Sequence, residues 1–239
     1  MSIQSSTRDQ LEVLDARQVA KRYRACAVAS VYDVLDELGY PNQCLDLGIK
    51  PLVPEWRLAG PAFTVVGSRE PRWGEEHAKP ALKDHGLLRS IPPGSVVVIN
   101  AERDTLVGHW GEIMSITAKT RGAVGAVIDG GTRDRNGIVK IPDWAVFARY
   151  TSPVECRQRW QPQEMQVPIY MSGTLTSSVL VRPGDYLVGD ADGVVVVPDQ
   201  VVIRVLELTE ELEVREENTR RDVVAGVPIE EVYNRYGRL

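Results

Sequence analysis

The adjacent residues Arg133 and Asp134 are the pair in this 239-residue chain whose chemistry is most readily interpreted. A guanidinium offers a planar set of donors that matches a carboxylate or an enolate oxygen. An aspartate offers a hard oxygen ligand, and Mg²⁺ typically takes one or two carboxylates and keeps several waters. Together they are suited to hold a 2-oxo acid and stabilise the charge it gains when a carbon–carbon bond breaks. On an open turn, the same pair would be a surface ion pair worth under about 1 kcal/mol.

A second set of candidate residues lies at the start of a predicted helix, at Gly111, Glu112, Ile113 and Met114. The first amides of a helix have no partner within it and, with the helix dipole, attract an anion. These four positions are therefore candidates for substrate binding, although an acid such as Glu112 is also simply favourable in a first helical turn. His109 lies three residues before Glu112, but no third His or Cys is suitably placed. We interpret it as a hydrogen-bonding loop residue.

The segment between the two sets predicts how they meet. A helix is expected from Gly111–Glu112 to Gly122, followed by a buried strand over the apolar run Ala123 to Ile128. Asp129-Gly130-Gly131 then predicts a tight turn, since glycine adopts positive φ at little cost. Residues that follow a buried strand lie at its carboxyl end, where α/β sheets bind ligands. Arg133 and Asp134 are therefore expected to face the exposed amides.

The composition indicates an ordinary globular protein, with 43% hydrophobic and 26% charged residues and a net charge of −5. No basic stripe suggests a nucleic-acid surface, and no apolar run is long enough for a membrane span, so neither partner is expected. Cys26, Cys44 and Cys156 form no CxxC motif, which favours a cytoplasmic location over a disulfide scaffold or a zinc knuckle.

The remaining patterns predict a mixed α/β fold in one compact unit, with an α/β domain over 1–198 and a C-terminal helical extension over 199–239. Strands and helices alternate before residue 198, and a long amphipathic helix rich in Glu and Arg follows it. The expected elements are helices over 8–24, 27–38 and 80–89, a loop over 68–79, strands over 57–67, 96–99, 144–150 and 167–172, a polar excursion over 156–166, a hairpin of 179–185 with 190–198, and two final helices.

Several segments of the chain resemble the RraA-like family, which includes the 4-hydroxy-4-methyl-2-oxoglutarate/4-carboxy-4-hydroxy-2-oxoadipate aldolases. The central match is WGEIMSITAKT followed by RGAVGAVIDGGTRD. The segments AVASVYDVLDELG, RLAGPAFTVVG and PGDYLVGDADGVVVVP also match, in the family's order and across roughly residues 27 to 198. The resemblance implies a swivelling β/β/α domain with a mixed sheet and, in the aldolase branch, a C-terminal helical extension.

The resemblance also implies a class II aldolase that needs a divalent cation, Mg²⁺ or Mn²⁺, and no Schiff-base lysine. Asp134 would hold the metal, Glu112 would face it through water, and Arg133 would contact the keto oxygen of a small 2-oxo acid. Cleavage of a 4-hydroxy-2-oxo acid, or decarboxylation of oxaloacetate, would then pass through the enolate of pyruvate. Sites would lie between subunits of a homotrimer or homohexamer, with a C-terminal glutamate reaching a neighbouring site: Glu213, Glu216 or, preferentially, Glu217.

One position departs from the aldolase pattern. An acid is expected three residues after the aspartate of the pair, and this chain has Gly137 there. The departure leaves open a second function, that of a non-enzymatic regulator that binds and inhibits a ribonuclease, as RraA itself does. The intact Arg133–Asp134 pair and the C-terminal extension favour the lyase instead.

Overall fold

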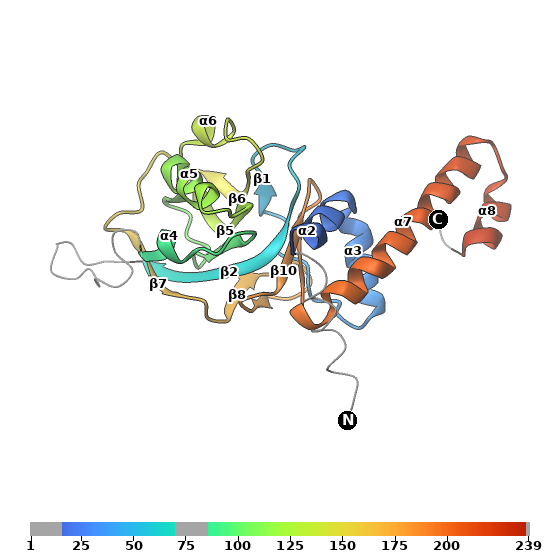
Figure 1. The fold of residues 1–239 in the computed structure, drawn as a ribbon, viewed down its shortest axis with the longest axis horizontal. Coiled ribbons are helices and arrows are strands. Elements are labelled where there is room, and N and C mark those ends of the chain that lie inside the picture. Colours follow the sequence, from blue (N-terminus) through green and yellow to red (C-terminus); the bar gives the residue numbers. More distant parts are fainter. Residues whose placement is uncertain (1–15, 70–85, 238–239) are drawn as a thin grey trace, which may run out of the picture.

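A nine-stranded mixed sheet forms the centre of the computed structural model, which describes residues 16–69 and 86–237 (Figure 1). Its strands are β1 (Lys50–Pro51), β2 (Leu58–Arg69), β3 (Val96–Asn100), β4 (Gly108–Trp110), β5 (Gly125–Thr132), β6 (Ala145–Thr151), β7 (Trp160–Met165), β10 (Tyr186–Gly189) and β11 (Val194–Val197). The main path runs β1-β6-β5-β3-β2-β10-β11, with β4 paired to β5 and β7 paired to β2. A separate hairpin joins β8 (Ile169–Ser172) to β9 (Ser178–Val181).

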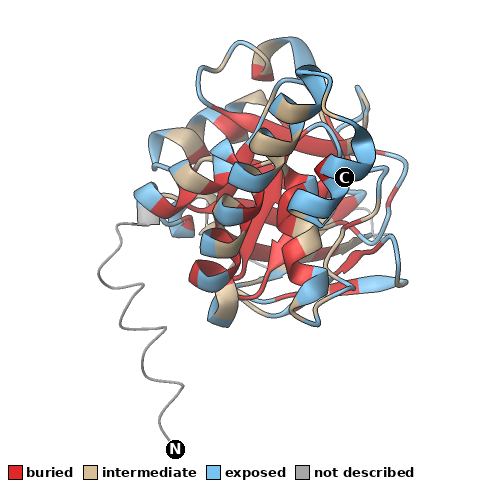
Figure 2. Cartoon of the chain, turned by 90° about the vertical axis from the view of Figure 1, so that its right-hand side faces the viewer, coloured by how far each residue is buried: buried red, intermediate tan, exposed pale blue. Residues whose placement is uncertain are grey.

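The middle of the sheet is parallel and is covered on both faces. Strands β2, β3, β5 and β6 pair in parallel, whereas β10 joins β2 antiparallel. Along β3, Val97 and Ile99 point into one cluster of buried residues, while Val96 and Val98 point into another. This alternation explains why β3 reads as a continuous apolar run, since neither face meets water. Buried residues accordingly follow the strands through the interior (Figure 2).

Helices pack on the two sides of this sheet, except at the C-terminal end of the chain, where they extend away from it (Figure 1). They are α2 (Ala16–Ala25), α3 (Val28–Glu37), α4 (Gly86–Ser90), α5 (Glu112–Thr120), α6 (Arg135–Ile138), a 3₁₀ turn η2 (Asp199–Val201), α7 (Val202–Val224) and α8 (Ile229–Tyr236). Helices α2, α3 and α7 share a cluster of buried residues with β10 and β11, and α4 and α5 share one with β3 and β5. None of the described helices combines the length and the apolar character that crossing a bilayer requires.

The predicted fold class is confirmed: the chain is a mixed α/β protein whose bent, nearly closed sheet carries a C-terminal helix (Figure 1). The predicted helix over 27–38 is α3, the strand over 57–67 is β2, and the two final helices are α7 and α8. The loop over 68–79 and the helix over 80–89 fall largely outside the described residues, as do His77, His85 and the first half of the helix over 8–24. The division into 1–198 and 199–239 stays a prediction.

The predicted glycine turn at Asp129-Gly130-Gly131 is wrong. All three residues belong to β5, which continues to Thr132, and neither glycine has a positive φ. Glycine is needed at these two positions because neighbouring side chains pack directly against the backbone of β5. A Cβ on Gly130 would lie 2.8 Å from Nδ1 of His109, and one on Gly131 would overlap the ring of Tyr150. The turn begins only after the strand ends, at Arg133 and Asp134.

Two other predicted elements are also wrong. Residues 156–166 are not a simple polar excursion, because Trp160–Met165 forms β7 along the outer half of β2. The strand is polar because only Trp160 is buried in it. The hairpin predicted from 179–185 and 190–198 has the wrong first arm. Strand β9, which begins at Ser178, pairs with β8, and the strand that pairs with β11 is β10.

We predict that Gly131→Ala destabilises the protein by about 1–3 kcal/mol, the usual cost of overpacking a filled interior. The added methyl would meet the Tyr150 ring and, 2.6 Å away, the carbonyl oxygen of Val107, which precedes β4 and accepts a hydrogen bond from the Tyr150 hydroxyl at 2.9 Å, so neither group can move aside cheaply. Urea denaturation followed by circular dichroism measures the change. An unchanged midpoint would show that β4 and β5 are packed less tightly than described.

Candidate functional site

The start of α5 is held against the end of β5 by backbone pairing. Strand β4 runs parallel to β5, and the amide of Arg133 donates to the carbonyl of Trp110 at 2.8 Å. The hydroxyl of Thr132 donates to the same carbonyl at 2.7 Å. Because Gly111 and α5 follow Trp110 directly, this pairing brings the first turn of α5 beside Arg133 and Asp134.

Asp134 points at the first turn of α5. Its Oδ2 lies 3.4 Å from the amide nitrogen of Glu112 and would lie 2.8 Å from a Cβ on Gly111. Its backbone is left-handed, with φ 59° and ψ 33°, a conformation that aspartate tolerates better than most residues. Such sparsely populated geometry concentrates at functional sites, where the surrounding structure enforces it. The conformation turns the carboxylate back toward the helix.

The guanidinium of Arg133 lies next to this carboxylate, with Nε 3.5 Å from Oδ1 of Asp134. The two side chains are 33% and 41% exposed. At that exposure the ion pair itself adds little to stability. Both groups therefore remain accessible to a small molecule, while their backbones are fixed by β5 and α6.

The carboxylate of Glu112 lies over the backbone of α6 at Gly137. A Cβ at position 137 would overlap the Cδ and both carboxylate oxygens of Glu112. The absence of a side chain at Gly137 thus admits an acid from α5 into the space where a side chain of α6 would otherwise lie. The acid expected at position 137 is missing, but a carboxylate is present beside it.

The predicted anion-binding amides are also in place. Ser115 is the first residue of α5 whose amide bonds within the helix, to the carbonyl of Gly111 at 3.0 Å. Within the described residues, no acceptor contacts the amides of Ile113 or Met114, and the Ile113 side chain is 72% exposed. The structure therefore brings together all the candidates from the central motif: Gly111, Glu112, Ile113, Met114, Arg133 and Asp134. Their roles remain predictions.

The donor set here suits a hard, hydrated cation. Among residues 16–69 and 86–237, no cluster of three or more His, Cys, Asp or Glu side chains could enclose a metal. A zinc site of the usual four-ligand type therefore does not fit this part of the chain. The carboxylates of Asp134 and Glu112 at one helix start do fit Mg²⁺ or Mn²⁺, which can be held by one or two carboxylates while retaining water.

His109 supports the site from beneath. It lies in β4, not in a loop, but the prediction that it makes hydrogen bonds is confirmed. Its Nδ1 accepts the amide of Gly131 at 3.1 Å, and Nε2 lies 3.3 Å from Oδ2 of Asp104, without the alignment of a good hydrogen bond. The ring also meets Trp160 edge-on, with centroids 4.9 Å apart. Burial lowers the pKa of His109 despite the opposing effect of Asp104.

The candidate Glu217 does not approach this site within its own chain. It lies in the second half of α7, which runs away from the part of the molecule that holds α5 and α6 (Figure 1). Its side chain pairs with Arg220 one turn later. A role for Glu217 at the site would therefore require a second copy of the chain, and that role stays a prediction.

The comparisons with known proteins agree with the central motif. The family model described as RraA-like: Aldolase/RraA matches residues 28–196, which include every candidate except the C-terminal glutamates Glu213, Glu216 and Glu217. A protein of Halalkalibacterium halodurans named "Putative 4-hydroxy-4-methyl-2-oxoglutarate aldolase" is 32% identical over 206 residues, covering 86% of this chain and 89% of that protein.

Two further relatives differ in length or description. Protein DlpA of Legionella pneumophila is 27% identical over 88% of this chain, and the chain spans only 32% of its length. A crystal structure of Streptomyces coelicolor RraAS2, described as an unusual member of the RNase ES inhibitor RraA protein family, superposes with a TM-score of 0.71. It is 26% identical, and the match covers 85% of this chain and 97% of that one.

We predict that His109 makes the fold sensitive to mild acid. Because its pKa is lowered in the folded protein, the unfolded chain binds a proton more readily, and stability falls as the pH drops below about 6.5. His109→Gln cannot titrate, so its unfolding free energy should decline less than that of the natural chain between pH 7.5 and 5.5. Urea titrations at both pH values provide the measurement, and equal declines in the two proteins would contradict the assignment.

Proposed function

Since the chain belongs to the RraA-like family, we propose that it is a divalent-metal-dependent lyase that cleaves 4-hydroxy-2-oxo acids to release pyruvate. Decarboxylation of oxaloacetate is proposed as a second activity of the same site. The observation that carries the proposal is the meeting of Arg133, Asp134 and Glu112 at the first turn of α5. The relative from H. halodurans supports the choice of substrate class.

The proposed reaction breaks the bond between C3 and C4 of the substrate. Its electron pair moves into the C2–C3 enolate, whose charge rests on the former keto oxygen, while the C4 hydroxyl loses its proton and becomes a carbonyl. Protonation of C3 then gives pyruvate. With oxaloacetate, the same bond breaks and carbon dioxide leaves. Both routes need stabilisation of negative charge on one oxygen, the term that usually contributes most to such catalysis.

Each residue has a distinct part in this scheme. The free amides of Ile113 and Met114 bind the C1 carboxylate, and the fork of Arg133 donates to the keto oxygen as it becomes an enolate. Asp134, with Glu112 through water, would hold Mg²⁺ or Mn²⁺, which supplies Lewis-acid polarisation of the keto group. Glu112 acts as the base and takes the C4 hydroxyl proton through one bridging water, an arrangement that general-base catalysis allows.

We also propose that the working unit is a homotrimer or homohexamer with sites between subunits. Helix α7 has 23 residues, but its buried side chains end at Leu212. Apolar side chains beyond that point are open to solvent: Val214 is 63% exposed, Val224 83% and Tyr233 of α8 53%. A neighbouring subunit would cover these groups, and Glu217 lies on the same stretch, from which it would reach that subunit's site.

The second candidate function is a ribonuclease-binding regulator. Gly137 and the resemblance to RraAS2 favour it. Under this alternative, the pair Arg133–Asp134 would have no catalytic use. Purified protein would turn over neither 4-hydroxy-4-methyl-2-oxoglutarate nor oxaloacetate with Mg²⁺ or Mn²⁺ and would bind and inhibit an RNA-degrading enzyme.

We predict that pyruvate release from both substrates requires metal and the Arg133–Asp134 pair. EDTA should abolish turnover, and added Mg²⁺ or Mn²⁺ should restore it. Asp134→Ala should remove activity, and Arg133→Lys should lower kcat by roughly 100-fold or more, since one ammonium cannot replace the fork at a developing oxyanion. A lactate dehydrogenase-coupled assay measures the release.

The matched control for this experiment is Arg121→Lys, an exposed arginine at the other end of α5, which should retain full activity. Turnover that persists in EDTA, or an Arg133→Lys enzyme as fast as the natural one, would rule out the proposed chemistry.

We predict that Gly137→Ala harms catalysis without harming the fold. Its methyl group would push aside only the flexible end of Glu112, so the melting temperature should change little. Turnover should fall as far as it does in Glu112→Ala, and the double variant should be no slower than either single one, because each change displaces or removes the same carboxylate. Additive losses would show that Gly137 and Glu112 act separately.

A further inference from the structure

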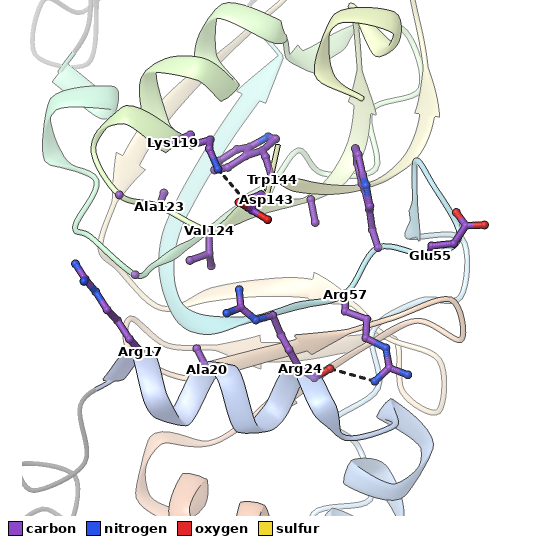
Figure 3. A pocket seen from close by; sticks show the side chains of 14 residues that line it. Arg17, Ala20, Arg24, Glu55, Arg57, Lys119, Ala123, Val124, Asp143 and Trp144 are labelled. Carbon is purple, nitrogen blue, oxygen red and sulfur yellow. Dashed lines mark hydrogen bonds between the residues drawn. The ribbon is translucent and has the colours of Figure 1, made fainter. Parts of the chain in front are cut away.

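A hollow lies at the amino ends of the parallel strands, opposite the candidate lyase site. It has a volume of about 930 Å³, within the range of small-molecule sites. Gly94 before β3, Val124 before β5 and Ala145 at the start of β6 contribute to its lining, whereas the candidate lyase site lies at the carboxyl end of β5. Figure 3 shows α2 along one wall and the end of α5 along the other. We call this hollow the α2–α5 cleft.

The α2–α5 cleft is lined by four basic side chains, Arg17, Arg24, Arg57 and Lys119, against two acidic ones. Arg57 Nη1 donates to carbonyls at the C-terminal end of α2, including that of Arg24 at 3.1 Å, and to that of Cys26 just after the helix at 3.0 Å. Lys119 Nζ donates to the carbonyl of Asp143 at 3.0 Å. These partners are neutral, so they fix the two cations in place without cancelling their charge.

Arg24 is the basic group best placed to meet a ligand. Its guanidinium extends from α2 into the space between Val124 and Arg57 (Figure 3). Among the described residues, no carboxylate lies within ion-pairing distance of Arg24, Arg57 or Lys119. Glu55 and Asp143 also line the cleft but form no ion pair with these three cations, so the lining keeps an excess of positive charge that a bound anion would offset.

The floor of the cleft is apolar and aromatic. Trp144, Ala20 and Ala145 form its buried base, and Trp56, which is partly exposed, is the aromatic side chain that a ligand can contact. An inorganic ion would leave Trp56 uncovered, whereas an aromatic body would pack against it. Aromatic rings beside cations are a common means of binding an organic molecule that carries negative groups.

From this combination we infer that the α2–α5 cleft binds a small organic dianion with an aromatic body, whose carboxylate or phosphate groups contact Arg24, Arg57 and Lys119. The site is separate from the one at Arg133 and Asp134. It does not depend on the proposed lyase activity.

Isothermal titration calorimetry of the full chain tests this inference with phenyl phosphate and benzene-1,3-dicarboxylate, two aromatic dianions that separate the phosphate source from the carboxylate source. At least one should bind, and more tightly than inorganic phosphate or phenol, each of which offers half of the recognition. Raising the salt from 50 to 500 mM should weaken binding, because the cations are partly exposed. Absence of binding by both dianions, or equal binding of inorganic phosphate, would overturn the inference.

Arg24→Gln should weaken binding by about fivefold or more, the loss expected for one partly exposed charged contact. The matched control is Arg215→Gln, an exposed arginine on α7 away from the cleft lining, which should bind as the natural chain does. Asp134→Ala should also leave binding unchanged. If Asp134→Ala abolished binding while Arg24→Gln did not, the ligand would occupy the lyase site and the α2–α5 cleft would be excluded.

Discussion

The hydrogen bond from the Arg133 amide to the Trp110 carbonyl is the contact on which the candidate site depends. It extends β4 alongside β5 at the point where one chain segment enters α5 and the other leaves the sheet. Without it, the amides of α5 and the carboxylate of Asp134 would belong to unrelated loops. A backbone bond of this kind is insensitive to side-chain identity. The geometry therefore rests on the strand pairing, and the side chains are left free for chemistry.

The sequence was sufficient to predict this meeting but not the means by which it is achieved. The start at Gly111 and the apolar run before Asp129 are local signals, so the helix and the presence of the strand were predicted correctly, although the strand continues to Thr132. Gly130 and Gly131 were misread because glycine has two uses, positive φ and close approach, and only tertiary packing decides between them. Here the rings of His109 and Tyr150 occupy the space that side chains would need.

The less predictable features all depend on contacts between distant segments. Strand β7 is polar because it lies along one edge of β2, so no apolar alternation marked it. The support beneath the site joins His109 to Trp160 and to Asp104, and no spacing in the chain indicates that these three meet. The position of Glu112 beside Gly137 likewise depends on a contact between two helices that are separate in sequence. A motif comparison sees a missing acid at 137, whereas the structure shows one carboxylate supplied from another helix.

Helix α5 has a position that connects the two ends of the molecule. Its first turn faces Asp134, while Lys119, in its last turn, lines the cleft at the opposite edge of the sheet. A nine-residue helix is about 13 Å long, so a single short element joins the two places. Occupancy at one end that tilts or slides this helix alters the affinity at the other, and thermodynamic reciprocity makes the two effects equal in free energy. The shared helix therefore supplies the physical connection that any coupling between the two sites would need.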